Sequence, residues 1–192
     1  MMGEQPFALR PSPFALRMHR KLTTTELNRL SAPEFRALEK FPLIIILDNV
    51  RSGLNVGSIF RSADAFNVEK IICCGITPVP PNRDVLKSAL GSTETVAWEF
   101  ASSTMDSIIQ LKAQGVLCYA VEQTEQSLLL HEFALQPEKR YALVFGNEVD
   151  GVDQGVIDAC DGTIEVKQFG TKHSLNVAVC GGIVLHELLK MS

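Results

Sequence analysis

After Pro42 the chain alternates short apolar runs with segments of helical periodicity, and this alternation constrains the fold more than any other feature. The first run, Leu43–Leu47, is apolar at every position, which is typical of a parallel strand covered on both faces. The further strands that we expect are Lys70–Cys74, Thr95–Trp98, Val116–Val121, Tyr141–Phe145 and Gly162–Val166. The expected helices are Asn55–Phe66, Thr104–Gln114, Gln154–Ala159 and a final helix over about Ser174–Lys190. The pattern predicts an α/β domain with a mainly parallel sheet and helices on both faces, whose ligands bind at the carboxyl ends of strands.

The bulk composition is that of a globular protein. The 192 residues are enough for one domain with a substantial core, or for a small domain with an appendage. No apolar run approaches the length that spans a bilayer, and prolines interrupt the N-terminal residues where a signal core would lie, so we expect no membrane association. The five cysteines form no CxxC pair, which predicts reduced core thiols and a cytoplasmic location. The four histidines lack metal-site spacing, and we expect no metal.

The first forty residues differ from the rest of the chain in charge. They carry seven Lys and Arg against four Asp and Glu, whereas residues 41–192 carry eleven against eighteen. A basic arm on an acidic body suits a protein that touches a polyanion locally, although a solvated tail has the same composition.

Two segments make up this N-terminal region. Residues 1–17 contain FALR twice between prolines and no obvious packed element, so we interpret them as a disordered extension. A helical apolar pattern runs from Thr24 to Lys40, with a break at Ser31 and Pro33, and predicts a basic helical arm over residues 18–41. The side chains of this arm that we expect to contact phosphates are Arg20, Lys21 and Arg29.

The loop that leads into the first expected helix has the sequence DNVRSGLNVGSIFR, from Asp48 to Arg61. Asn55 suits a helix N-cap, and Gly57 allows a close approach in the first turn. Arg61 lies six positions after Asn55, so the two need not share a face. Taken alone, the segment also fits a capped helix with a surface arginine. It contains no GxGxxG, which argues against an ordinary dinucleotide-binding fold.

Two later loops also place polar residues after strands. In FGNEVDGV, Phe145–Val152, turn chemistry explains the Asn, Asp and Gly but not the carboxylate of Glu148 at the strand's end. The third stretch, FGTKHSLNVAVCGGIVLHEL, opens the final helix. Ser174 can serve there as an N-cap, but a cap does not account for Asn176.

In order, the three loops read Asn-x-Gly-x-x-x-Arg, Gly-Asn-Glu-x-x-Gly and Gly-x-x-x-Ser-Leu-Asn-Val. This set resembles the three signature motifs of the SpoU (TrmH-like) branch of the SPOUT RNA methyltransferases, over roughly Leu43 to Leu189. The segment KSALGSTE, Lys87–Glu94, is also similar to a loop of that family. Within the branch, the chain looks most like the short TrmH-like enzymes that lack a separate RNA-binding domain. The resemblance places a SPOUT methyltransferase domain at residues 42–192.

The resemblance implies a fold, a cofactor and a reaction. The C-terminal part would form a deep trefoil knot, the protein would be a homodimer with active sites near the subunit interface, and S-adenosylmethionine would be the cofactor. The reaction would be methyl transfer to a ribose 2′-hydroxyl of structured RNA. We expect tRNA rather than rRNA, because no separate RNA-binding domain is visible. The alternatives are an rRNA 2′-O-methyltransferase and a catalytically inactive knotted RNA-binding protein; a nucleotide-binding oxidoreductase is disfavoured by the missing glycine fingerprint.

The family's functional residues can be carried over by position. The catalytic set falls on Arg61, Asn55, Glu148, Ser174 and Asn176. A guanidinium is a poor proton acceptor, so we expect Arg61 to be a fixed cation that stabilises charge on the 2′-oxygen, with Asn55 and Glu148 orienting the reacting groups. The cofactor contacts fall on Val121, Gly146, Val166 and Leu175.

Three further expectations concern neighbouring positions. Glu122 would reach the cofactor's hydroxyls, and Gly181 and Gly182 would allow close packing of the final helix. The run Val166–Phe169 departs from the more apolar or proline-containing run that relatives often carry.

Overall fold

A computed structural model describes residues 20–190, which form two compact units that divide between Ser31 and Ala32. Residues 1–17, the expected extension, lie outside the described residues. In the first unit, residues 24–28 form turns, and Asn28 has a left-handed φ of 46°. The helical pattern between Thr24 and Lys40 yields only α1 (Ala32–Ala37), which belongs to the second unit. Residues 20–31 contain no helix, so the expected helical arm is wrong there. Helix α1 begins only at Ala32, because Pro33 lacks an N–H and fits only the first turn of a helix.

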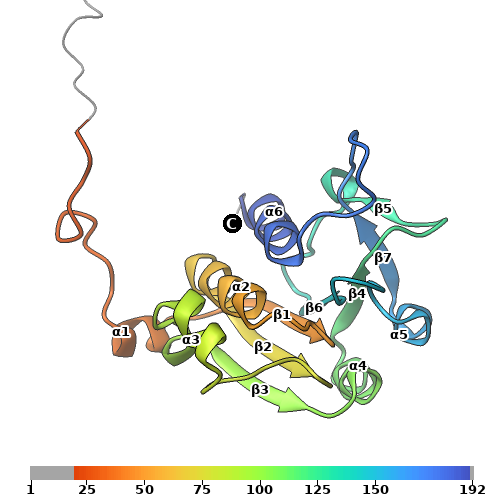
Figure 1. Cartoon of the computed structure of the whole chain (residues 1–192), viewed down its shortest axis with the longest axis horizontal. Helices are drawn as coiled ribbons and strands as arrows, with labels where there is room; N and C mark the ends of the chain where they lie inside the picture. Colours follow the sequence, from red (N-terminus) through yellow and green to blue (C-terminus); the bar gives the residue numbers. More distant parts are fainter. Residues whose placement is uncertain (1–19, 191–192) are drawn as a thin grey trace, which may run out of the picture. The chain divides into compact units, whose positions relative to one another are not determined.

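The second unit is built on a sheet in which every strand pair is parallel (Figure 1). Its order is β3-β2-β1-β6-β4-β7-β5. The strands are β1 (Phe41–Asp48), β2 (Val68–Cys74), β3 (Ala97–Ala101), β4 (Leu117–Val121), β5 (Leu128–Leu129), β6 (Tyr141–Phe145) and β7 (Gly162–Glu165). On β1, Leu47 is opposite Cys73 of β2 and Phe145 of β6. The mainly parallel sheet is thus confirmed, and the carboxyl ends of the strands lie at one edge.

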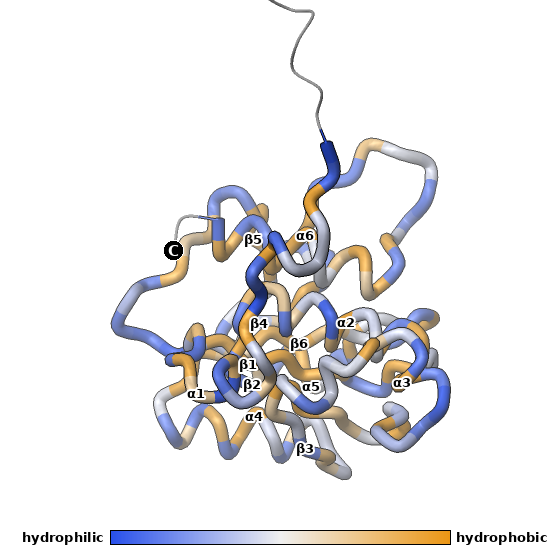
Figure 2. Tube along the Cα trace, turned by 90° about the vertical axis from the view of Figure 1, so that its left-hand side faces the viewer, coloured by the Kyte–Doolittle hydropathy of each residue, from blue (hydrophilic) through white to orange (hydrophobic). Residues whose placement is uncertain are grey.

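Helices cover both faces of this sheet (Figure 1). On one face lie α2 (Gly53–Ala65), α3 (Arg83–Ala89) and α6 (Val177–Leu189), and on the other α4 (Thr104–Ala113) and α5 (Gln154–Ala159). On β1, Ile45 belongs to the first core and Ile46 to the second, because successive side chains of a strand point to opposite faces. This explains the unbroken apolar run, and the central strands are accordingly mostly orange in Figure 2. No helix within residues 20–190 is long and apolar enough to cross a membrane.

Most expected elements are present, and two helix starts differ. Helix α2 begins at Gly53 with Ser52 as its N-cap, not at Asn55. Helix α6 begins at Val177 with Asn176 as its N-cap, so the expected start at Ser174 is wrong. Helix α3 follows the prolines of the β2–β3 connection and was not expected from the sequence.

Among the glycines inside the described helices, the closest contact lies between α2 and α3. A Cβ on Gly57 would be 2.1 Å from Ser88 Oγ and 2.3 Å from the Val85 carbonyl oxygen. On α6, a Cβ on Gly181 or Gly182 would meet its nearest atom at 3.8 or 3.9 Å, an ordinary van der Waals distance. The expectation that Gly181 and Gly182 are needed for close packing is therefore wrong within this chain, and Gly57 has that role.

We predict that Gly57→Ala lowers the free energy of unfolding by about 1–3 kcal/mol, because the methyl group must displace the backbone of α3. The matched control is Gly182→Ala, also inside a 13-residue helix, where alanine should add about 0.5–1 kcal/mol through its higher helix propensity. Urea unfolding of both variants measures the two values. Equal stability of the two variants would show that α2 and α3 can separate without cost.

Candidate functional site

A cavity of about 1350 Å³ opens beside the carboxyl ends of β4, β6 and β7. All four predicted cofactor contacts line it, namely Val121, Gly146, Val166 and Leu175. So do three residues of the predicted catalytic set, Glu148, Ser174 and Asn176. Sites for single small molecules usually have volumes of about 300–1,000 Å³, so this cavity has room for more than one ligand group.

A chain of hydrogen bonds joins the three loops at the edge of this cavity. The Glu148 carboxylate accepts hydrogen bonds from the backbone N–H groups of Arg51 (3.0 Å) and Ser52 (3.1 Å). It also accepts one from Asn55 Nδ2 at 2.9 Å. Asn55 Oδ1 in turn accepts a hydrogen bond from Asn176 Nδ2 at 3.1 Å. The structure thus brings Asn55, Glu148 and Asn176 together, although they are far apart in the sequence.

The local capping pattern explains why these side chains are available to one another. Ser52 Oγ accepts the hydrogen bond from the backbone N–H of Asn55, so Ser52 caps α2 and the Asn55 amide is free to reach the other loops. Asn176 Oδ1 accepts from the N–H groups of Ala178 (2.9 Å) and Val179 (3.3 Å) and caps α6. Its Nδ2 remains for Asn55, so one side chain starts a helix and also joins the network.

The protonation state of Glu148 follows from its partners. Partial burial would raise the pKa of its carboxyl, but the hydrogen bonds from Arg51, Asn55 and the other donors outweigh burial and lower the pKa. The side chain is therefore a charged acceptor at neutral pH with most of its hydrogen-bonding capacity used. Such a group suits alignment of other groups better than proton transfer.

The loop that carries Glu148 is braced by Asn147, in the turn role that the sequence predicted, and by Glu122, whose contact with this loop was not predicted. Asn147 Oδ1 accepts hydrogen bonds from the N–H groups of Val149 and Asp150, both at 2.9 Å. Glu122 accepts from the N–H of Val152 at 3.1 Å and from that of Gln123 at 2.9 Å. Glu122 lines the cavity, and its contact with cofactor hydroxyls stays a prediction.

Residues 166–175 form an exposed connection between β7 and α6. Gln123 Nε2 donates a hydrogen bond to the His173 carbonyl oxygen at 2.8 Å and so ties this connection to the end of β4. Ser174 lines the cavity, but within residues 20–190 its side chain has no hydrogen-bond partner. Its predicted catalytic role therefore stays a prediction.

Arg61 is the predicted catalytic residue that the structure does not bring to the site. It is exposed on α2, does not line the cavity, and makes no hydrogen bond or ion pair with any described residue. The six-residue separation from Asn55 places Arg61 about 240° around the helix and about 9 Å along its axis. The two side chains consequently point in different directions.

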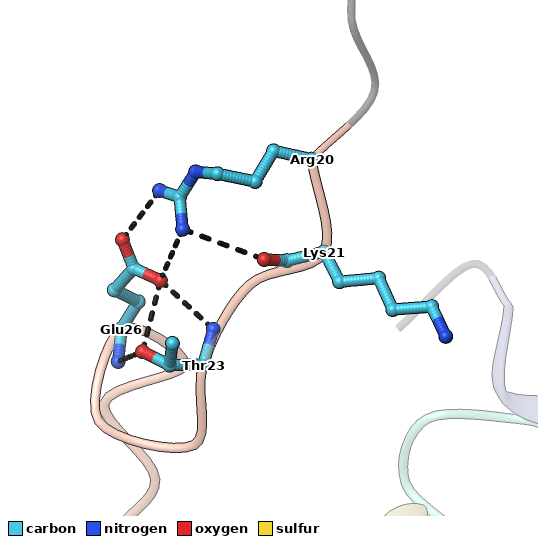
Figure 3. A network of polar contacts seen from close by, with 4 residues as sticks. All are labelled: Arg20, Lys21, Thr23 and Glu26. Atoms are coloured by element: carbon cyan, nitrogen blue, oxygen red, sulfur yellow. Dashed lines mark hydrogen bonds and ion pairs between the residues drawn. The ribbon is translucent and has the colours of Figure 1, made fainter.

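The arm residues Arg20, Lys21 and Arg29 lie in the first unit. Figure 3 shows that Arg20 pairs with Glu26, at 2.6 Å, while the Lys21 side chain extends away from this network. The Arg20 guanidinium, with the hydroxyl and N–H of Thr23, lowers the pKa of Glu26 to about 2. Arg20 would have to exchange this carboxylate for a phosphate, and RNA binding by the arm stays a prediction.

Two further groups lie beside the site, the buried Asp48 and the partly buried Cys180. The Asp48 carboxylate, at the end of β1, accepts hydrogen bonds from Thr104 Oγ1 (2.6 Å) and from the N–H of Asp153 (3.3 Å), which ties β1 to α4 and α5. The sequence feature that could have identified Asp48 is its position as a charged residue directly after the apolar run Leu43–Leu47. Burial raises the pKa of Cys180, which lines the cavity, to about 11, so this thiol is neutral and unsuited to nucleophilic attack.

Comparison with known proteins places these features in one family. The sequence profile of the SpoU rRNA Methylase family matches residues 42–186. The 23S rRNA (guanosine-2′-O-)-methyltransferase RlmB of Neisseria meningitidis is 33% identical over 150 residues, which are 78% of this chain and 59% of that protein. The chain spans about 60% of the length of the curated relatives it matches first.

Solved structures show the same fold. The crystal structure of the A. aeolicus TrmH/SpoU tRNA modifying enzyme superposes with a TM-score of 0.72 at 26% identity, over 83% of this chain and 81% of that one. An AdoMet-bound rRNA methyltransferase from Sinorhizobium meliloti superposes with a TM-score of 0.70 at 26% identity, over 80% of this chain and 58% of that one.

We predict that the two functions of Asn176 can be separated by substitution. Asn176→Ala loses the α6 cap and should lower the free energy of unfolding by about 1 kcal/mol. Asn176→Asp keeps a capping oxygen, and its charge suits a helix N-terminus, so its stability should stay close to wild type. Chemical denaturation of the two variants is the measurement. If Asn176→Asp lowers the free energy of unfolding as much as Asn176→Ala does, the hydrogen bond to Asn55, and not the helix cap, is the contact that stabilises the fold.

Proposed function

Since this chain belongs to the SpoU rRNA methylase family, we propose that it transfers a methyl group to a ribose 2′-hydroxyl of RNA. The observation that carries the proposal is the hydrogen-bonded chain from Glu148 through Asn55 to Asn176 at the rim of the cavity. Those three residues come from the three sequence motifs, and the relative from N. meningitidis is named for the same chemistry on guanosine.

The lining of the cavity fits S-adenosylmethionine, the methyl donor of the family. Val121, Val166 and Leu175 offer apolar surface for an adenosine, at strand ends where backbone groups are available for hydrogen bonds. The acidic side chains of the lining suit the sulfonium and ammonium charges of this cofactor; they are Glu122, Glu125, Glu148, Asp150, Asp158 and Glu165. When bound, S-adenosylmethionine supplies the methyl group.

The residues of this chain would align the reacting groups. No acid is needed for a neutral thioether leaving group, so orientation and charge at the 2′-oxygen are what the protein can contribute. The Glu148 carboxylate holds the Asn55 amide, and Asn55 holds Asn176, which fixes the rim beside Ser174. A guanidinium from Arg61 would stabilise the negative charge that develops on the oxygen and bind an adjacent phosphate.

The position of Arg61 supports a homodimer in which each site uses an arginine of the other subunit. Arg61 points away from Asn55 on its own helix and has no partner within residues 20–190. Two apolar side chains spaced by four on α6, Val179 and Ile183, are exposed and would bury against a second copy.

For the substrate, we propose ribosomal RNA. Although the A. aeolicus structure is named as a tRNA modifying enzyme, three curated relatives at 30% identity or more are named as 23S rRNA enzymes, so the comparisons do not favour the tRNA preference that we took from the sequence. The trefoil knot and the cytoplasmic location are likewise proposals. An experimental structure that traces residues 141–189 tests the knot, and cell fractionation tests the location.

Methyl transfer from labelled S-adenosylmethionine to ribosomal RNA and to tRNA tests the proposed function. We expect label in ribosomal RNA, and nuclease digestion with mass spectrometry should place it on a ribose. Asn176→Asp should bind the cofactor and remain folded but transfer methyl more slowly, because aspartate cannot donate to Asn55. A wild-type protein that binds S-adenosylmethionine but labels neither RNA, or that labels a base, sinks the proposal.

We predict that Arg61→Ala lowers the methyl-transfer rate by about 10²–10³ while cofactor affinity and stability stay unchanged, the scale of one lost oxyanion contact. Arg61→Lys should recover only part, because an ammonium cannot reproduce the planar fork. Subunit exchange between Arg61→Ala and Asn176→Ala should restore about a quarter of wild-type activity, since half of the dimers are mixed and each mixed dimer has one complete site. A mixture no more active than its components would show that Arg61 does not serve the partner's site.

A further inference from the structure

The connection between β7 and α6 exposes an aromatic ring beside the cavity. Phe169 has 88% of its surface exposed, the highest value among the exposed large hydrophobic side chains of residues 20–190. Its ring does not line the cavity, but the neighbouring Gln168 does. A phenylalanine exposed at the rim of a site offers a large flat apolar face to a ligand.

The charges around this ring are of one sign. Residues 166–176 contain Lys167 and Lys172 and no acidic residue, on a body that carries eighteen Asp and Glu against eleven Lys and Arg. Lys167 Nζ lies 5.4 Å from the centroid of the Phe169 ring, within cation–π range. The lining of the adjacent cavity is acidic, so these lysines form a local positive rim around it.

We propose that residues 166–173 form an RNA-contact loop, in which Phe169 stacks on an unpaired base next to the methylated ribose and Lys167 and Lys172 bind the flanking phosphates. The inference rests on the proposed function, and it narrows the substrate to a nucleotide in a single-stranded loop or bulge. Proteins recognise such nucleotides by stacking unpaired bases on aromatic rings, whereas a base inside a duplex has no free face.

A second copy of the chain is a poorer occupant for this loop. The cores of protein–protein interfaces are depleted of lysine, and Phe169 has lysines on both sides within three residues. The exposed apolar side chains of Val179 and Ile183 on α6 offer a copy a better surface. Gln123 ties the C-terminal end of the loop, at His173, to the segment that follows β4, which keeps the loop beside the cavity.

Binding of a mixed-sequence single-stranded oligoribonucleotide, and of the same strand paired with its complement, tests this proposal by fluorescence anisotropy. Phe169→Ala should bind the single strand about tenfold more weakly, within the range for one lost base–aromatic stack, and leave duplex affinity unchanged. Phe169→Tyr should bind like wild type, and Phe169→Leu, which is apolar without a π face, should be as weak as alanine. Phe100→Ala, which removes another exposed aromatic on the edge strand β3, is the matched control and should have no effect.

The lysines have their own readout and control. Each of Lys167→Gln and Lys172→Gln should reduce the slope of log affinity against log salt by about 0.7, the value for one phosphate contact on a single strand. Lys139→Gln, in the exposed connection that precedes the amino end of β6, should leave the slope unchanged. Calorimetric affinity for S-adenosylmethionine should be the same in all variants, because none of these side chains lines the cavity.

The outcomes separate this inference from the proposed function. If wild type methylates RNA and Phe169→Ala binds and methylates equally well, the loop has no such role and the function stands. If Phe169→Leu keeps full affinity while Phe169→Ala sediments as a monomer, the ring packs on a second copy and the proposal is wrong. Wild-type protein that binds no single-stranded RNA also overturns it. If the stacking series behaves as expected but no methyl is transferred, the loop stands and the proposed enzyme falls.

Discussion

The arrangement of the site depends on one carboxylate that accepts hydrogen bonds from two backbone N–H groups and one amide. Glu148 belongs to the loop after β6, and its donors belong to the loop after β1 and to the first turn of α2, so this single side chain fixes two neighbouring strand ends relative to each other. Its pKa is lowered, and the loop therefore loses this stabilising charge only when pH falls below the carboxyl's ordinary range. Asn55 extends the connection to Asn176 and thus to the start of α6. The position of the last helix and the geometry of the cavity rim are consequently set by the same bonds.

Much of the fold could be predicted from the sequence, because the central strands of a parallel sheet are buried on both faces and are therefore apolar at every position. Leu43–Leu47 and Tyr141–Phe145 are apolar throughout, as is typical of strands that are covered on both faces. The order of the strands was not accessible, since β6 inserts between β1 and β4 through contacts that no local pattern encodes. Helix α3 was missed because proline-rich connections usually lack helices, and the start of α6 was misplaced because serine and asparagine are both good caps two positions apart.

For the site, the three motifs identified the loops, and seven of the nine catalytic and cofactor-contact residues predicted there line the cavity. What the sequence could not show is which side chains face one another. Asn55 was expected to cap its own helix, yet a serine three residues earlier takes that role and releases the amide. Gln123 acts through a backbone carbonyl of a loop fifty residues away, and such a contact leaves no spacing pattern in a single sequence. Arg61 was identified by its motif alone. That its side chain points away from Asn55 became evident only from its position on α2.

The distribution of charge adds a physical constraint on how an RNA could approach. An acidic cavity attracts a cationic cofactor and repels a phosphate backbone, so the polyanion must be held from the periphery while only a ribose enters. Basic groups are available outside the cavity: Arg61 on α2, and Lys167 and Lys172 beside it on the connection to α6. A flexible single strand can place one ribose inside while its phosphates stay on these groups, whereas a rigid duplex would carry its phosphates toward the acidic lining. The electrostatics of the body therefore favour the same unpaired substrate as the exposed ring of Phe169.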